Sequence, residues 1–276
     1  MPDPSSSTRS WARAFAGRPE AVGETRRPAT LNLEARLGTR LFPASFRVWD
    51  DPTQVTHQGE TLVGHYLYDD EAVAAARLDL VTDGRLTALC RSRAPLRKLS
   101  GSTGHARSPA NSAPQAHIAN LFIEDQKGLS PEDLKTELLA AARDEGLEFA
   151  LRVTTLQVPG AFSSRPDLIR YFNRPGAGEP GRLGDPVGVY KVSVKDGQET
   201  PVRGLEFAPV EVRALRHIVA AGLQPRVFNH VGFGYVGITP PVAVIAPPLL
   251  FDDLELQRIR EEFDALPLLP PPRARR

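Results

Sequence analysis

Residues 76–92 read ARLDLVTDGRLTALCRS, and this stretch decides the fold class. Alternate positions are apolar or β-branched on both sides of its centre, namely Leu78, Leu80 and Thr82 before it and Leu86, Ala88 and Cys90 after it. Asp83 and Gly84 lie at the centre, and an Asp-Gly pair accepts the positive φ values that a tight hairpin needs. The stretch therefore predicts an antiparallel β-hairpin.

Four other segments carry strand patterns of the same kind. They are SFRVWDDP at 45–52, EFALRVTTLQV at 148–158, VGVYKVSVKDGQETPVRG at 187–204 and TPPVAVIAPPLL at 239–250. The third contains a second hairpin turn at Asp196-Gly197. The chain also has 26 prolines and 22 glycines. Such frequent punctuation favours many short strands and loops over a helical bundle.

Helices are predicted in three places. The clearest is SPEDLKTELLAAARDEG at 130–146, where Ser130 can cap, Pro131 suits the first helical position and Gly146 can end the helix. A shorter helix is predicted in 208–222, and a third after Asp252. The fold class that follows is α+β, with a predominantly antiparallel β-sheet, sandwich or barrel-like, and about three helices.

Composition divides the chain into three predicted parts. Residues 1–30, rich in Ser, Pro and Arg, are expected to form a flexible N-terminal segment, and residues 31–266 the folded domain. Residues 267–276 form a proline- and arginine-rich tail, which is expected to be extended.

Charge and composition exclude several classes of protein. The 34 basic and 33 acidic residues leave no basic excess, so no nucleic-acid partner is expected. No apolar run approaches the roughly 18 residues of a membrane span, so no membrane association is predicted. The N-terminus lacks the apolar core of a signal peptide, and a cytoplasmic location is expected. A single cysteine, Cys90, excludes an intrachain disulfide and a cysteine-based zinc cluster.

The segment LVGHYLYDDEAV at 62–73 concentrates groups able to bind metal or transfer protons. His65, Asp69, Asp70 and Glu71 fall within it. On an extended strand His65 and Asp69 could share one face, with Glu71 beside them, and hold a divalent ion. Equally, YDDE at 68–71 could form a solvated turn in which Asp70 caps neighbouring amides.

A second candidate is the loop GSTGHAR at 101–107. Its His105 and Arg107 could bind an anion or a peptide carboxylate, or could simply be surface-loop residues. Cys90 continues the apolar alternation of the hairpin and is interpreted as a small core residue. The glycines of GFGYVG at 232–237 have the spacing of a dinucleotide-binding loop, but Pro240 and Pro241 follow and prevent the required helix.

Five segments in a fixed order carry a resemblance to a known family. They are RLFPASFRVWDDPT at 40–53, the acidic segment and hairpin at 64–93, STGHAR at 102–107, IANLFIEDQKGLSPEDL at 118–134 and VIAPPLLFDDLELQ at 244–257. Together they resemble the C-terminal domain of the TldD/PmbA (TldD/TldE) metallopeptidase family, over about residues 31–270.

The resemblance carries expectations about chemistry. Catalytic members of the family have a His-Glu-x-x-x-His helix upstream of this domain and a late cysteine ligand. The sequence contains neither, so it implies no catalytic residues in this chain, no metal site and no bound zinc or other cofactor. The glycine of the family's Asp-Asp-Glu-Gly segment is replaced by Ala72, which removes a residue able to take positive φ.

Three functional hypotheses follow. The first is a non-catalytic or split member of the family, which works on peptide with a metal-motif-bearing partner chain or as a homodimer. The second is a hydrolase with its own site around His65, Asp69–Glu71 and His105, and the third is a β-rich scaffold that binds peptide. Six residues are predicted to face substrate: His65, Asp69, Asp70, Glu71, His105 and Arg107.

Overall fold

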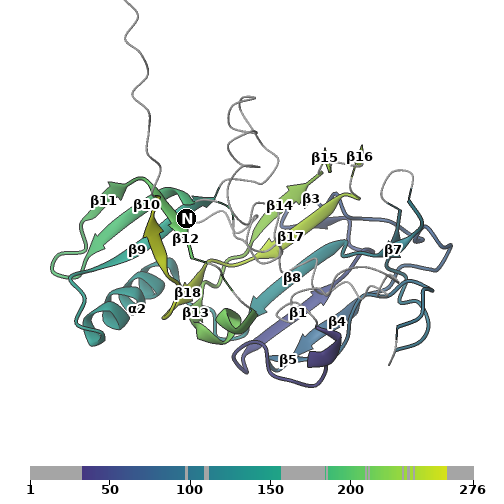
Figure 1. Ribbon diagram of the computed structural model, residues 1–276, viewed down its shortest axis with the longest axis horizontal. Helices are drawn as coiled ribbons and strands as arrows, with labels where there is room; N and C mark the ends of the chain where they lie inside the picture. Colours follow the sequence, from purple (N-terminus) through teal and green to yellow (C-terminus); the bar gives the residue numbers. More distant parts are fainter. Residues whose placement is uncertain are drawn as a thin grey trace, which may run out of the picture.

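The structure is a computed structural model, and it describes residues 33–259 except 97–98, 109–111, 157–183, 185, 209, 211, 232, 235–236 and 239. The predicted segments 1–30 and 267–276 lie outside these residues. Within them the fold is α+β and rich in strands, as predicted (Figure 1).

A six-stranded sheet forms the larger part of the fold, in the order β14-β17-β8-β1-β4-β5. Its strands are β14 (Arg226–His230), β17 (Val242–Ala246), β8 (Asn120–Asp125), β1 (Phe46–Asp50), β4 (Leu78–Thr82) and β5 (Arg85–Leu86). All neighbours are antiparallel except β17 and β8, which run parallel. The sheet is open, because β14 and β5 form its two ends.

Both faces of this sheet are covered by apolar side chains. Neighbouring residues of β8, Leu121 and Phe122, belong to two separate apolar clusters, and so do Val244 and Ile245 of β17. All five residues of β17 are buried. A strand covered on both faces has a continuous apolar sequence instead of an alternating one, which explains the run VAVIA.

The predicted hairpin is confirmed, but its second strand is short. Asp83 and Gly84 have φ values of +50° and +72°, as a tight two-residue turn requires. Pairing between β4 and β5 covers only two residue pairs, Val81 with Leu86 and Thr82 with Arg85. Beyond it, the amides of Thr87 and Ala88 both donate to the Leu80 carbonyl, so the regular ladder ends there.

A smaller layer lies beside the six-stranded sheet, at the left of Figure 1. It consists of the antiparallel sheet β11-β10-β9 and of helix α2 (Pro131–Asp144), which contacts β9. The strands are β9 (Phe149–Leu156), β10 (Pro186–Ser193) and β11 (Glu199–Val202). The amide of Asp133 donates to the Ser130 hydroxyl at 3.1 Å, which confirms the predicted N-cap.

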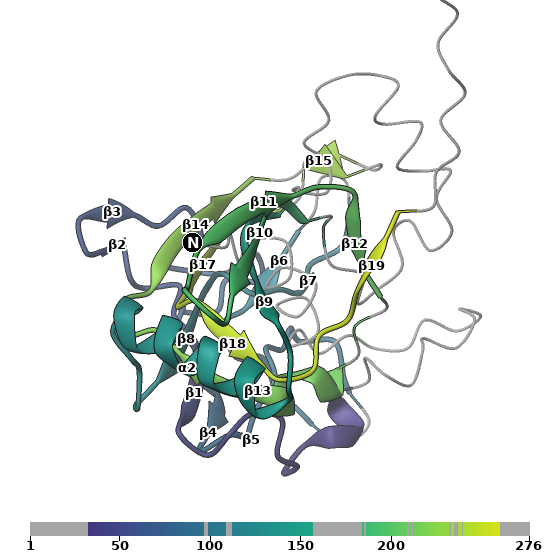
Figure 2. The same cartoon turned by 90° about the vertical axis from the view of Figure 1, so that its left-hand side faces the viewer.

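Short two-stranded elements complete the fold. They are β2–β3 (Thr56–His57, Glu60–Thr61), β6–β7 (Ala106–Arg107, Gln115–Ala116), β12–β19 (Leu205–Phe207, Leu256–Arg258), β13–β18 (Ile218–Ala221, Leu249–Phe251) and β15–β16 (Phe233–Gly234, Gly237–Ile238). The last pair places Phe233, Gly234 and Gly237 of the GFGYVG segment in strands. In Figure 2, α2 crosses in front of β18 and β13.

One predicted helical segment, and the described part of another, are not α-helices. Residues 208–222 form a 3-10 helix, η3 (Val212–His217), and then strand β13. The chain after Asp252 forms β19, and its remainder from residue 260 lies outside the described residues. In both places a partner strand takes up the backbone hydrogen bonds, and such tertiary pairing overrides a weak helical pattern.

The predicted number of about three helices is therefore too high for the described part of the chain. It contains one α-helix, α2, and the 3-10 helices η3 and η2 (Glu34–Arg36). None of its helices is long and apolar enough to cross a membrane.

The turn at Gly84 offers a sharp test of the hairpin. A Cβ there would lie 2.3 Å from the Phe42 carbonyl oxygen, in addition to the strain of positive φ. We expect Gly84→Ala to lower the free energy of unfolding by about 3 kcal/mol or more, because φ strain costs about 1–2 kcal/mol and the clash adds to it. Urea denaturation measures the change.

Gly59 supplies the matched control. Its φ is +86°, and a Cβ there meets nothing within 4 Å. Gly59→Ala should therefore cost only the strain, about 1–2 kcal/mol. Equal losses in the two variants would show that the close approach at Gly84 is not what fixes this turn.

Candidate functional site

The acidic segment Asp69–Glu71 is bound to the protein's own backbone. Asp69 is 5% exposed. One of its carboxylate oxygens accepts from the amides of Glu71 and Val73, at 3.0 and 2.8 Å, and the other accepts from the amide of Ala106 at 3.0 Å. A carboxylate that accepts several backbone bonds closes a turn and fixes a second loop to it.

Asp70 and Glu71 reach the same neighbouring loop. The amide of Ser108 donates to Asp70 Oδ2 at 2.5 Å, and the amide of Arg93 donates to Glu71 Oε2 at 2.7 Å. Thus all three acids of the segment accept bonds from the chain between Arg93 and Ser108. Asp70 caps an amide as the turn alternative predicted, but Asp69, for which no capping was predicted, is buried and accepts three backbone bonds.

His65 and Arg107 hold the two ends of this junction. His65 Nδ1 lies 2.9 Å from the Pro52 carbonyl oxygen, to which it can donate. The Arg107 guanidinium lies 4.5 Å from the centre of the Tyr66 ring, and the Tyr66 hydroxyl donates to the Gly104 carbonyl at 3.0 Å. These contacts fix the segment that contains Tyr66 against the loop that contains His105.

Ala72 occupies a backbone conformation that its side chain disfavours. Its φ is +58°, so the turn keeps the left-handed geometry although alanine stands where the family has glycine. The amide of Ala72 donates to the Asp69 carbonyl at 3.0 Å. The replacement has therefore left the turn in place and added strain of about 1–2 kcal/mol.

A second group of ionisable side chains lies inside the fold. Asp50, Cys90 and His105 are all buried, and one ligand-type atom of each lies within 4.8 Å of the others. His105 Nε2 is 3.3 Å from Asp50 Oδ1. Asp50 also accepts from the amide of Ala119, at 3.1 and 3.0 Å to its two oxygens.

Charge and burial shift the pKa values in this group. Burial alone lowers the pKa of His105, but Asp50, the Thr103 carbonyl and Asp69 raise it, and the net pKa lies above its usual value. Burial, aided by Asp50, raises the pKa of the Cys90 thiol. Burial and then Asp50 likewise raise the pKa of Tyr66. Both Cys90 and Tyr66 therefore favour their protonated, neutral forms.

The six residues predicted to face substrate divide into three environments. Asp69, Asp70, Glu71 and Arg107 come together where the acidic segment meets the loop before Ser108. His65 bonds separately to Pro52. His105 is 0% exposed and lies against Asp50, so in this structure its side chain faces the interior.

Sequence reasoning missed Asp50. The signal was present, because Phe46, Val48 and Asp50 alternate along β1 and all three are buried. A carboxylate at the third inward position of an apolar strand is rarely buried without partners. Its partner His105 comes from a loop about fifty residues later, and only the fold brings the two together.

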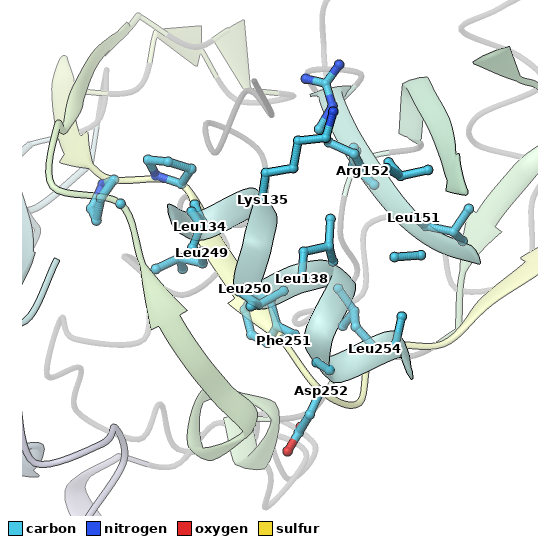
Figure 3. A pocket seen from close by; sticks show the side chains of 18 of the residues that line it. Leu134, Lys135, Leu138, Leu151, Arg152, Leu249, Leu250, Phe251, Asp252 and Leu254 are labelled. Carbon is cyan, nitrogen blue, oxygen red and sulfur yellow. The ribbon is translucent and has the colours of Figure 1, made fainter. Parts of the chain in front are cut away.

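An apolar cavity of about 850 Å³ lies between α2, β9 and β18. Leu134 and Leu138 of α2, Leu151 of β9, and Leu250 and Phe251 of β18 line it (Figure 3).

The cavity also has a charged margin. Lys135 and Arg152 lie there, and both form ion pairs with Glu199 of β11. Cavities of this size and character hold apolar ligands or the side chains of peptides.

Comparison with known proteins adds a family match and a fold match. Residues 22–155 match the profile of the PmbA/TldA metallopeptidase C-terminal domain. A metalloprotease from Archaeoglobus fulgidus is 33% identical over 92 residues, which is 33% of this chain and 20% of the relative. A metalloprotease from Methanothermobacter thermautotrophicus is 34% identical over 93 residues, 33% of this chain and 19% of the relative.

The structural comparison extends the likeness along the chain. TldE from Thermococcus kodakarensis superposes with a TM-score of 0.54 and 16% identity, covering 82% of this chain and 43% of that chain. At this identity the likeness concerns the fold alone. The chain thus spans less than half of the solved structure and about a fifth of the curated relatives in the matched regions.

Because Ala72 is strained, an alanine-to-glycine substitution there should change stability in the opposite direction from the same substitution at an unstrained alanine. Ala72→Gly should raise the free energy of unfolding by about 0.5–1 kcal/mol, because glycine accepts positive φ without a Cβ clash. Ala76 is exposed and does not have a positive φ. Ala76→Gly should therefore lower the free energy of unfolding by up to about 1 kcal/mol. Urea denaturation of both variants provides the measurement, and a loss in both would contradict the strained turn.

The ion pairs at the cavity margin predict that the stability of the folded protein depends on pH. The Arg152 guanidinium, with help from Lys135, holds the pKa of Glu199 below its usual value. The stabilisation is therefore fully present above the unfolded pKa of about 4.3 and is lost as pH falls through the lowered folded pKa. Glu199→Gln should destabilise the protein at neutral pH, and its difference from the wild type should shrink below about pH 4.

Urea denaturation of wild type and variant across this pH range measures the effect. Arg152→Gln serves as the matched variant, since it removes the main cause of the lowered pKa and should flatten the same pH dependence. A difference between wild type and Glu199→Gln that stays constant with pH would rule out this ion pair as its source.

Proposed function

The chain contains a C-terminal domain of the PmbA/TldA (TldD/PmbA) metallopeptidase family, and on that premise we propose that it is a non-catalytic subunit or a split member of a peptide-processing assembly. In this proposal a metal-motif-bearing chain of the same family supplies the catalytic zinc. Alternatively, the partner is a second copy of this chain, which forms a homodimer with it. The assembly would work in the cytoplasm on peptide substrates.

One observation carries the proposal, namely the match of residues 22–155 to the family's C-terminal domain. The curated relatives are named metalloproteases, and the matched region makes up about a fifth of each. A zinc peptidase needs three protein ligands and an open position for water. The family's ligands belong to a His-Glu-x-x-x-His helix and a late cysteine, and the sequence contains neither.

The junction between the acidic segment and its neighbouring loop is the proposed contact with substrate. Asp70 and Arg107 form an ion pair, with Arg107 Nε 3.4 Å from Asp70 Oδ2, and they keep 35% and 20% of their side chains exposed. The pair therefore reaches the surface from a fixed backbone, and a substrate carboxylate would compete with Asp70 for the guanidinium. The Arg107 guanidinium could pair with a peptide carboxylate. Glu71 and His65 flank it, whereas buried Asp69 and His105 would act only by holding the loop in place.

The alternative of a stand-alone peptide-binding scaffold is favoured by the apolar cavity between α2, β9 and β18. It needs no protease partner, and its ligand would be an apolar peptide segment. The hydrolase alternative receives less support, because His65, Asp69 and His105 have different partners in the structure.

Co-expression with a metal-motif chain of the family tests the proposal. We expect the two chains to co-purify, the pair to cleave unfolded peptides, and a chelator to abolish that activity. The partner alone should be at least about tenfold less active, as for a site completed by contacts from a second chain. Peptide cleavage and size-exclusion chromatography supply the two measurements.

A pair of arginine variants examines the substrate contact within the same assembly. Arg107→Met should raise KM about tenfold, the value of one charged hydrogen bond, while the exposed control Arg85→Met should leave it unchanged. Chelator-sensitive cleavage by this chain alone would overturn the non-catalytic role. A chain that binds peptide but no metal-motif partner would support the scaffold instead.

A further inference from the structure

We propose that Asp50, Cys90 and His105 form a closed site for a divalent metal ion of the zinc class. The three residues come from different parts of the chain: Asp50 ends β1, Cys90 follows β5, and His105 precedes β6. They offer a carboxylate, a thiolate and an imidazole, a donor set that suits Zn²⁺. This set shares no residue with the family's zinc motif.

The spacing of the three donors suits a single ion. One ligand atom of each residue lies within 4.8 Å of the other two. Zinc holds nitrogen and oxygen ligands at about 2.0–2.1 Å, which separates two tetrahedral ligands by about 3.3 Å. The observed separation of His105 Nε2 and Asp50 Oδ1 is 3.3 Å.

The orientation of His105 is an independent observation. Its Nδ1 lies 2.7 Å from the Thr103 carbonyl oxygen, which can only accept, so the proton belongs on Nδ1. That tautomer directs the lone pair of Nε2 toward the group. Nε2 is fully buried, and its 3.3 Å contact with Asp50 Oδ1 does not have the geometry of a hydrogen bond.

A metal ion satisfies this arrangement better than a proton does. A proton on Nε2 would serve two of the donors, His105 and Asp50, and leave the Cys90 sulfur outside this polar contact, with only its packing role in the apolar core. A divalent ion serves all three, and with a thiolate and a carboxylate its charge is balanced inside the fold. On binding, the Cys90 thiol proton, and any proton on Nε2, leave to solvent.

The surroundings also match those of metal ligands. A ligating histidine usually donates its other ring N–H to a carbonyl or carboxylate, as His105 does to Thr103. Asp50 is held by the amide of Ala119. The three side chains fill three of zinc's four tetrahedral positions, and a water molecule would take the fourth. Because all three side chains are buried, that position is closed to a peptide substrate, and the ion would stabilise the junction of β1 with the His105 loop instead of catalysing a reaction.

Refolding of the full chain with and without metal tests the proposal. The purified protein is unfolded with a chelator present, freed of chelator and refolded with Zn²⁺ or Co²⁺. We expect one equivalent to bind, the midpoint of thermal unfolding to rise, and the cobalt form to show a thiolate-to-metal charge-transfer band. No stoichiometric binding, or a cobalt spectrum without that band, would overturn the site.

Single variants identify the ligands. Cys90→Ala and His105→Asn should each weaken zinc binding by about 100-fold or more, since even the outer partners of ligands account for 10–100-fold. His217→Gln is the control, because His217 is exposed and pairs with Asp252. Binding that survives in both ligand variants, or that is lost in the control, marks adventitious binding by other histidines and contradicts the proposal.

The wild-type cobalt spectrum decides the matter even if a ligand variant does not fold. The result is also separate from the proposed function, because co-purification and peptide cleavage do not depend on this buried ion. A chain that binds no stoichiometric metal on refolding and still activates its partner would remove the site and leave the proposed function intact.

Discussion

The buried carboxylate of Asp50 is the constraint on which much of the structure depends. It lies at the inward end of β1 and is completely inaccessible to solvent. An isolated charge in that position would cost several kcal/mol. The Ala119 amide and His105 offset this cost, and each belongs to a different segment. The segment before β8 and the loop before β6 are therefore fixed to the end of β1 by one side chain.

The acidic segment Asp69–Glu71 extends the same principle to the surface. Its carboxylates accept hydrogen bonds from the amides of Val73, Arg93, Ala106 and Ser108. In this region of very short strands, bonds to charged side chains replace the strand-to-strand backbone bonds of a regular sheet. The turn survives with alanine at φ +58° because these bonds determine its shape. A segment that looks catalytic by composition thus positions a loop, and the ion pair between its Asp70 and Arg107 of that loop remains partly accessible to solvent.

The family match and the buried group of Asp50, Cys90 and His105 concern different properties of the protein, namely its proposed role with a partner and the stability of its fold. Residues 22–155 match the C-terminal domain of the PmbA/TldA metallopeptidases, and the curated relatives are much longer than the region they share with this chain. In the proposed function, a partner chain would supply the zinc chemistry. The buried group of Asp50, Cys90 and His105 concerns the stability of this domain, and it would hold its ion whether or not a partner is bound.

Local sequence was sufficient to predict the Asp83-Gly84 hairpin, the strand β1 and the Ser130-capped helix α2. Each depends on neighbours within a few residues, where alternation and capping act. The helix predicted in residues 208–222 was wrong, and so was the part over Leu256–Arg258 of the helix predicted after Asp252, because partner strands from elsewhere took the backbone bonds. The packing of distant segments, in contrast, turns His105 inward to Asp50 while Arg107 remains partly exposed. Such a choice depends on which distant segment pairs beside the loop, and sequence spacing carries no information on that.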